Sequence, residues 1–106
     1  MKDNINLLEE TIEYMNRARL AVSDIIFIGC GTQECTWEEF VVLANRVYDC
    51  GYGGAEVDEG LTIGFSDGGQ MRRWEYDGSE RWEYIAPFRR PTTTTRLTSV
   101  FYEEGR

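Results

Sequence analysis

The chain has 106 residues, of which 42% are hydrophobic and 13% aromatic, and this composition is enough for one domain with a modest core. It contains no histidine, which excludes catalysis by a histidine base or by a Ser-His-Asp triad. The formal net charge of −8 at pH 7 disfavours direct binding to nucleic acid.

The negative charge is confined to the first part of the chain. Residues 1–60 contain twelve Asp and Glu against four Lys and Arg, a net of −8, whereas residues 61–106 contain seven of each. An acidic surface of this kind repels nucleic acid and attracts proteins that bind nucleic acid. It is also common as a plain solvated surface of a small protein, so the charge alone does not decide between the two.

The three cysteines are Cys30, Cys35 and Cys50. An odd number without a secretory leader predicts reduced thiols rather than a disulfide framework, and the spacing matches no zinc motif. No apolar run approaches the roughly 20 residues of a membrane span. We therefore expect a cytoplasmic protein without a metal, a cofactor or contact with a membrane.

Two amphipathic helices are predicted before residue 60. The first covers residues 2–20, with Ile5, Leu8, Ile12 and Met15 forming an apolar stripe, and leaves Glu9, Glu10 and Glu13 outside that stripe. The apolar run 25–28 predicts a buried strand or an extended connector. The second helix covers residues 37–48 and begins with a capping box, in which threonine at position 36 is followed by glutamate at 39.

Residues 49–60 are rich in glycine and in acidic side chains. The pattern is typical of a helix stop followed by a flexible loop. It is also compatible with an acidic recognition loop, or with a weak cation site formed by Asp49, Glu56, Asp58 and Glu59, although the spacing is not that of an EF-hand.

Residues 61–86 predict a three-stranded antiparallel meander, because turn signals at 67–69 and 77–79 separate runs rich in aromatic and β-branched residues. A two-residue loop at 77–78 would place Glu75 opposite Glu80, which is unfavourable. We therefore predict an odd-length loop in the second hairpin and a two-residue turn in the first. The cross-strand pairs would be Trp74–Trp82, Glu75–Arg81 and Arg73–Glu83, and the core face would hold Leu61, Ile63, Phe65, Arg72, Trp74, Tyr76, Trp82 and Tyr84.

The segment after Pro87 begins with a basic hinge that ends at Pro91 and continues with strand-forming residues at 92–95 and 97–102. It predicts a fourth strand, an arm that adds to the sheet of a partner, or a tail with one apolar patch. The predicted fold is therefore α+β, with two helices on one face of an antiparallel meander of three to four strands and a C-terminal arm. Residues 1–88 would form the domain and residues 89–106 the hinge and arm.

Three motifs carry a resemblance: W-E-E-F at 37–40, Y-D-x-G-Y-G at 48–53 and E-Y-D-G-S-E-x-W-E-Y at 75–84. Over residues 24–87 the chain resembles a family of small phage and prophage proteins. The resemblance implies an accessory phage gene product acting in the cytoplasm of a bacterial host, and it carries over no catalytic residue. In size, acidity and lack of catalytic motifs the chain is also similar to anti-CRISPR and anti-restriction proteins, a similarity of type rather than of motif.

The favoured function is a non-enzymatic inhibitor that binds a host defence protein on its basic nucleic-acid-binding surface, by steric blocking or by mimicry of nucleic acid. The residues expected to bind this partner are Glu34, Glu38, Glu39, Asp49, Glu56, Asp58 and Glu59.

Three alternatives remain from the sequence. One is a protein that sequesters a nucleotide signal, because arginine forks suit phosphates; its binding residues would be Arg72, Arg73, Arg81, Arg89 and Arg90. Another is a virion assembly protein, joined as a homodimer through the C-terminal arm. The last is an enzyme using the carboxylates of Glu75, Glu80 and Glu83, whose arginine neighbours explain them better as cross-strand pairs.

Overall fold

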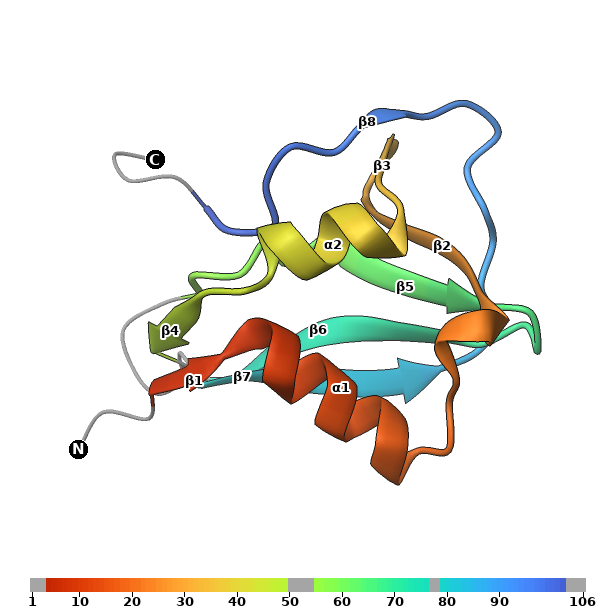
Figure 1. The fold of residues 1–106 in the computed structure, drawn as a ribbon. Coiled ribbons are helices and arrows are strands. Elements are labelled where there is room, and N and C mark those ends of the chain that lie inside the picture. The colour runs from red at the N-terminus through yellow and green to blue at the C-terminus, as the bar shows by residue number, and fades with distance from the viewer. Residues whose placement is uncertain (1–3, 50–54, 77–78, 103–106) are drawn as a thin grey trace.

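A computed structural model describes residues 4–49, 55–76 and 79–102 of the chain, apart from the side chain of Tyr76. Two helices and a sheet make up the fold (Figure 1). In chain order the elements are β1 (Asn4–Asn6), α1 (Leu7–Arg17), the 3₁₀ turn η1 (Val22–Asp24), β2 (Ile25–Cys30), β3 (Gln33–Glu34), α2 (Trp37–Leu43), β4 (Val47–Asp49), β5 (Leu61–Phe65), β6 (Gln70–Tyr76), β7 (Ser79–Ile85) and β8 (Thr95–Arg96).

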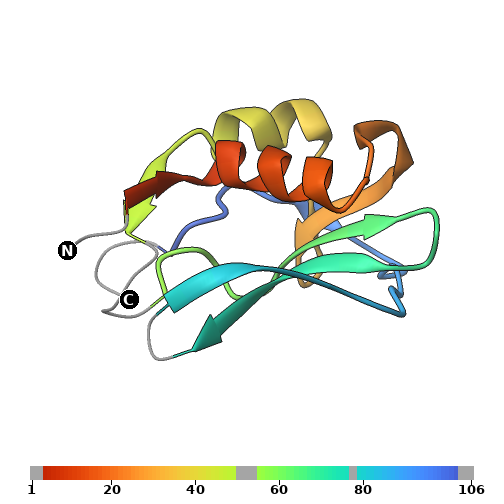
Figure 2. The ribbon, with the colours of Figure 1, turned by 90° about the horizontal axis from the view of Figure 1, so that it is seen from below.

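The main sheet has six strands in the order β7-β6-β5-β2-β3-β8. Its pairs are antiparallel except for β3 and β8, which run parallel, and β1 and β4 form a separate two-stranded sheet. The prediction of a three- to four-stranded meander is therefore wrong, although the α+β character is confirmed. Both helices lie on the same side of the main sheet (Figure 2).

Helix α1 begins later than the sequence pattern predicts. The side chain of Asn6 caps it by accepting a hydrogen bond from the N–H of Glu9 at 3.0 Å, and residues 4–6 pair with β4 instead. The buried stripe also differs, because Thr11 is fully buried whereas Ile12 is 40% exposed. The hydroxyl of Thr11 donates to the carbonyl of Leu7 at 2.7 Å and accepts from the indole N–H of Trp82 at 3.0 Å, which satisfies it in the core.

Helix α2 has the predicted beginning but not the predicted end. The capping box is confirmed, with Thr36 and Glu39 each bonded to the backbone N–H of the other. The helix stops at Leu43, and Val47–Asp49 becomes strand β4, which pairs with β1. Pairing with a distant segment thus overrides the helical pattern of residues 44–48.

Both predicted hairpin registers are wrong by one residue. In the first hairpin Ile63 pairs with Met71, so the loop has three residues, with Gly68 in the left-handed region at φ +91°. In the second hairpin Arg73 pairs with Trp82, and Glu75 lies opposite Glu80, the pair that the prediction avoided. The turn residues 77–78 lie outside the described part of the chain.

The register decides which side chains of β6 face the core. Met71 and Arg73 are buried under the helices, whereas Arg72 is exposed and Trp74 half-buried on the outer face. The predicted core positions in β5, together with Trp82, are buried as expected. Strand β6 thus turns to the core the side chains that were predicted to face outward, and the reason is the environment of Arg73, described below.

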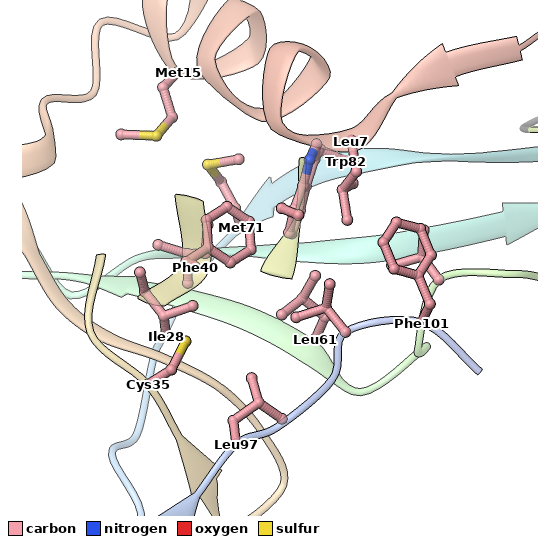
Figure 3. Packing of buried hydrophobic residues seen from close by; sticks show 14 of the residues in the cluster. Leu7, Met15, Ile28, Cys35, Phe40, Leu61, Met71, Trp82, Leu97 and Phe101 are labelled. Carbon is pink, nitrogen blue, oxygen red and sulfur yellow. The ribbon is translucent and has the colours of Figure 1, made fainter. Parts of the chain in front are cut away.

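The C-terminal segment wraps around the sheet. Phe88 packs on the outer face against Phe27, with ring centres 5.5 Å apart, and occupies the space above Gly64, where a Cβ would lie 2.4 Å from the Phe88 ring. Residues 95–96 then form β8 at the far edge of the sheet. Leu97, Val100 and Phe101 enter the core (Figure 3), so the residues expected to form an arm pack on their own chain.

In the described parts of the chain, neither helix has the length and apolar character needed to cross a membrane.

Candidate functional site

Three of the acidic residues predicted to bind a partner gather around the start of α2. Glu39 is bonded to the backbone of Thr36 at 2.9 Å and forms an ion pair with Arg96 at 3.0 Å. The first of these contacts contributes most to lowering the pKa of the Glu39 carboxyl, and Arg96 lowers it further. Glu38, on the same turn, is exposed. Of Glu38 and Glu39, only Glu38 therefore presents its charge fully to solvent.

Glu34, in β3, holds the C-terminal segment in place. It accepts hydrogen bonds from Arg90 at 2.9 Å and from the hydroxyl of Thr94 at 2.8 Å. Arg90 also donates to the carbonyl of Ile26 at 2.7 Å and lies over the ring of Phe27. Glu34 is half-buried, and its charge is matched within the chain, so its contacts explain it as a structural residue.

The second group of predicted acids lies around the start of β5 and in β4. The carboxylate of Asp58 accepts the N–H of Gly60 at 2.8 Å, and the N–H of Glu59 donates to the hydroxyl oxygen of Tyr102 at 3.0 Å. Glu56 and Glu59 are exposed, and Asp49 ends β4. Within the described residues, no group of three or more acidic or cysteine side chains is arranged to hold a metal ion. Residues 50–54 of the predicted loop lie outside the described part.

The five arginines of the nucleotide alternative do not form one site. Arg72 pairs with Glu83 at 3.2 Å, and Arg81 lies 4.1 Å over the ring of Trp74, both on the outer face. Arg73 is buried on the opposite face, under the helices. Arg90 is bonded to β2 and β3, and Arg89 is exposed. A phosphate site would need several of these guanidinium groups to converge, and the fold disperses them.

A buried ion-pair network around Arg73 was not predicted. The guanidinium lies 3.3 Å from Glu10, donates to the hydroxyl of Tyr48 at 2.7 Å, and lies 3.6 Å from Glu80. The side chains of Arg73 and Glu80 are each only 2% exposed. The Arg73 guanidinium also lies over the ring of Trp82 at 4.9 Å.

Glu80 links this network to the chain before β5. Its two oxygens accept the N–H groups of Glu56 at 2.7 Å and Val57 at 3.2 Å. Burial raises the pKa of the Glu80 carboxyl, against the opposing effect of these donors and of Arg73. The sequence predicts for Glu80 either a catalytic carboxylate or a cross-strand pair with arginine, and neither expectation places it in the core, where the structure buries it.

The two cysteines that the structure describes are poorly suited to chemistry. Cys30 is half-buried and Cys35 is buried. Burial, with a contribution from Asp58, raises the pKa of Cys30 to about 12, and burial raises that of Cys35 to about 11. A raised pKa disfavours the thiolate at neutral pH, the opposite of the shift that activates a catalytic cysteine.

The outer side of the helical layer carries Glu38, which is among the predicted partner-binding acids, and two acids of α1 that are not. Glu9 and Glu13 of α1 and Glu38 of α2 are exposed, and both helices lie on the same face of the molecule (Figure 2). Apolar side chains lie among them, because Ile12 is 40% and Val42 is 76% exposed. We name this surface, Glu9, Ile12, Glu13, Glu38 and Val42, the helical face.

A groove of about 390 Å³ borders the helical face between α2 and the C-terminal segment. Its apolar lining comes from Val42, Leu43 and Leu97, and its charged lining from Glu38 and from the ion pair of Glu39 with Arg96. Apolar side chains beside the carboxylate of Glu38 suit a long basic side chain, whose aliphatic stem packs while its charged end meets the carboxylate.

Substituting Glu39 by glutamine should lower the melting temperature at neutral pH. The lowered pKa means that the carboxylate stabilises the fold above its ordinary pKa of 4.5 and loses this effect as the pH falls. The difference between Glu39→Gln and the parent chain should therefore shrink below pH 4.5, as measured by circular dichroism melts across pH. Glu38→Gln, exposed in the same turn, is the matched control; an equal effect of both would show that the charge of Glu39 gains nothing from its contacts with Thr36 and Arg96.

Comparison with protein-family models, with curated proteins and with solved structures found no match to this chain.

Proposed function

We propose that the chain is a small non-enzymatic inhibitor that binds a basic, nucleic-acid-binding protein through its helical face. The observation that carries the proposal is that each of the two helices on the same side of the sheet combines at least one exposed acid with an exposed apolar side chain. Protein interfaces combine an apolar centre with a charged rim, and acidic charge accelerates the encounter with a basic partner.

The class of partner follows from the resemblance of residues 24–87 to phage proteins. A phage accessory protein acts in the bacterial cytoplasm, where the host's defence proteins are among those with basic nucleic-acid-binding surfaces. Occupying such a surface with carboxylates would exclude the nucleic acid. The proposal differs from the sequence-based expectation in its residues, because Glu34, Glu39 and Asp58 are half-buried and bonded within the chain, whereas Glu13, although it pairs with Arg17, is 72% exposed.

A pull-down of the tagged chain from lysate of bacteria carrying CRISPR or other defence systems tests the proposal. A nucleic-acid-binding protein should be retained at about 50 mM salt and released at about 500 mM, because salt screens contacts between exposed charges. Recovery of a small ultraviolet-absorbing molecule from the heated chain, with no protein partner, would overturn the proposal in favour of the nucleotide alternative.

Reversing the charge of the helical face should abolish retention. The triple variant Glu9→Lys, Glu13→Lys and Glu38→Lys changes three exposed side chains and leaves the buried network untouched. We expect the amount of captured partner to fall by at least about tenfold, since several favourable charge contacts become repulsive.

The matched control is Glu56→Lys, Glu59→Lys and Glu75→Lys, which produces the same change in net charge at exposed positions outside the helical face. Retention by this control together with loss in the first triple supports the helical face. The reverse pattern would contradict it and would place the interface around residues 55–60.

A further inference from the structure

Strand β7 forms an open edge of the main sheet. It pairs with β6 along its whole length, from Ser79 to Ile85, and no other described strand lies on its second side (Figure 1). An edge of seven residues offers a row of backbone N–H and C=O groups to a further strand. What could occupy this edge is decided by the side chains that flank it.

Helix α1 does not close over this edge. A groove of about 600 Å³ lies between α1 and β7, lined by Tyr14 of the helix and by Trp82 and Tyr84 of the strand. The strand therefore has free space beside it on the inner face of the sheet. On the outer face, Arg81 and Glu83 flank Trp82 symmetrically in the sequence.

We propose that two copies of the chain pair through β7, antiparallel and centred on Trp82. Residues directly opposite each other in a sheet point to the same face. In two identical antiparallel strands related by a two-fold axis, this holds only if one residue lies opposite its own copy, so the pairing must be centred on a residue. In the register centred on Trp82, all seven residues are paired and Arg81 of each copy lies opposite Glu83 of the other. Opposite charges in this position stabilise a strand pair.

The neighbouring registers are unfavourable. Centring the pair on Arg81 places two arginines opposite each other, and centring it on Glu83 or Glu80 places two glutamates opposite each other. Like charges in directly opposite positions destabilise a strand pair. The sequence of β7 thus selects a single central register for association with a second copy.

The contacts within one chain are compatible with this pairing. Arg72 binds Oε1 of Glu83 at 3.2 Å, and a carboxylate has a second oxygen that can accept another guanidinium. The guanidinium of Arg81 lies over the Trp74 ring, 4.1 Å from its centre, and a guanidinium in this position keeps N–H donors for a carboxylate. The pairing does not depend on the proposed inhibitor function and uses a different surface.

Complementation between two variants tests the pairing. In a dimer of Arg81→Glu, the new glutamate would lie opposite Glu83 of the other copy, and in a dimer of Glu83→Arg, the new arginine would lie opposite Arg81. Because both arrangements bring like charges together, each variant by itself should dimerise at least about tenfold more weakly than the parent chain. In an equimolar mixture both contacts become attractive again, and a heterodimer should form. Sedimentation equilibrium over protein concentrations of about 10 μM to 1 mM measures the dimerisation of the parent chain, of each variant and of the mixture.

Two control variants make the same charge changes elsewhere. Arg89→Glu and Glu38→Arg alter exposed residues outside β7 and should dimerise like the parent chain. A thermal melt of each variant establishes that it is folded. Hydrogen exchange of the unmodified chain gives a test without substitutions, because amides of residues 79–85 should become more protected as the concentration rises.

The proposal is overturned if the parent chain stays monomeric up to about 1 mM, which would leave the edge to an extended segment of another protein. It is equally overturned if the chain dimerises but the mixture of variants associates no better than each variant alone. A heterodimer in the mixture, with weak self-association of both variants, supports the register centred on Trp82.

Discussion

Replacing Arg73 by methionine is expected to destabilise the fold by about 3–5 kcal/mol, the usual cost of removing one partner from a buried ion pair. Methionine fills much of the volume but leaves Glu80, whose side chain is 2% exposed, without its guanidinium neighbour. Glu10 and the hydroxyl of Tyr48 lose the same partner. The free energy of unfolding from urea titrations, followed by tryptophan fluorescence, measures the loss.

Two further variants separate charge from packing. Arg72→Ala removes the neighbouring arginine, whose side chain is 52% exposed and whose pair with Glu83 should contribute about 0–1 kcal/mol. The double variant Arg73→Met and Glu80→Gln removes both buried charges and should recover part of the loss, giving a measurable coupling energy. A loss below about 1 kcal/mol in Arg73→Met would show that the network contributes little.

The same network explains why the strand register could not be predicted from the sequence. Local rules favour placing Glu75 away from Glu80 and placing the large aromatic residues of β6 in the core, even though this puts Arg72 on the same face as Trp74. The observed register instead lets Glu80 accept the N–H groups of residues 56 and 57 and brings Arg73 to Tyr48. These partners lie 23 to 25 positions away in the chain, and no pattern within the hairpin encodes them.

Features set by local chemistry were predictable. The capping box at Thr36 depends on two side chains three residues apart, and it is present. The burial of Leu61, Ile63 and Phe65 follows from the alternation of large apolar residues along β5, although Gly64 is buried too, under Phe88. By contrast, β8 has two residues and is defined only by its pairing with β3, about 60 positions earlier in the chain, so a sequence pattern offers no signal for it. Strand β3 also has only two residues, which is too short for an alternating pattern, although it pairs with the neighbouring β2.

The acidic surface was predictable in sign but not in place. A count of charges assigns the excess to residues 1–60, but only the fold shows which carboxylates are already bonded. Glu34 and Glu39 pair with Arg90 and Arg96, which lie in the segment that wraps around the sheet. Glu9 and Glu13 had been explained by helix amphipathicity, and that explanation is compatible with a role in binding.

Leu97→Ala should destabilise the chain by about 2–5 kcal/mol, the range for truncating a buried leucine. Leu97 is 2% exposed and belongs to the same cluster as Ile28, Leu61 and Phe40 (Figure 3). The substitution leaves a cavity under a segment that is tied to β3 by the N–H of Leu97, which donates to the carbonyl of Glu34 at 2.8 Å. Thermal and urea unfolding measure the effect, with the exposed neighbour Thr98→Ala as the control.

The outcome distinguishes a structural segment from an assembly arm. If residues 97–101 served mainly to join a partner, Leu97→Ala would leave the unfolding free energy of the single chain nearly unchanged and weaken self-association. Burial of Leu97, Val100 and Phe101 in the chain's own core predicts the opposite, a large loss of stability at every protein concentration. Association through β7 would then be reduced only in proportion to the fraction of unfolded chain, because that edge lies on the far side of the sheet from β8.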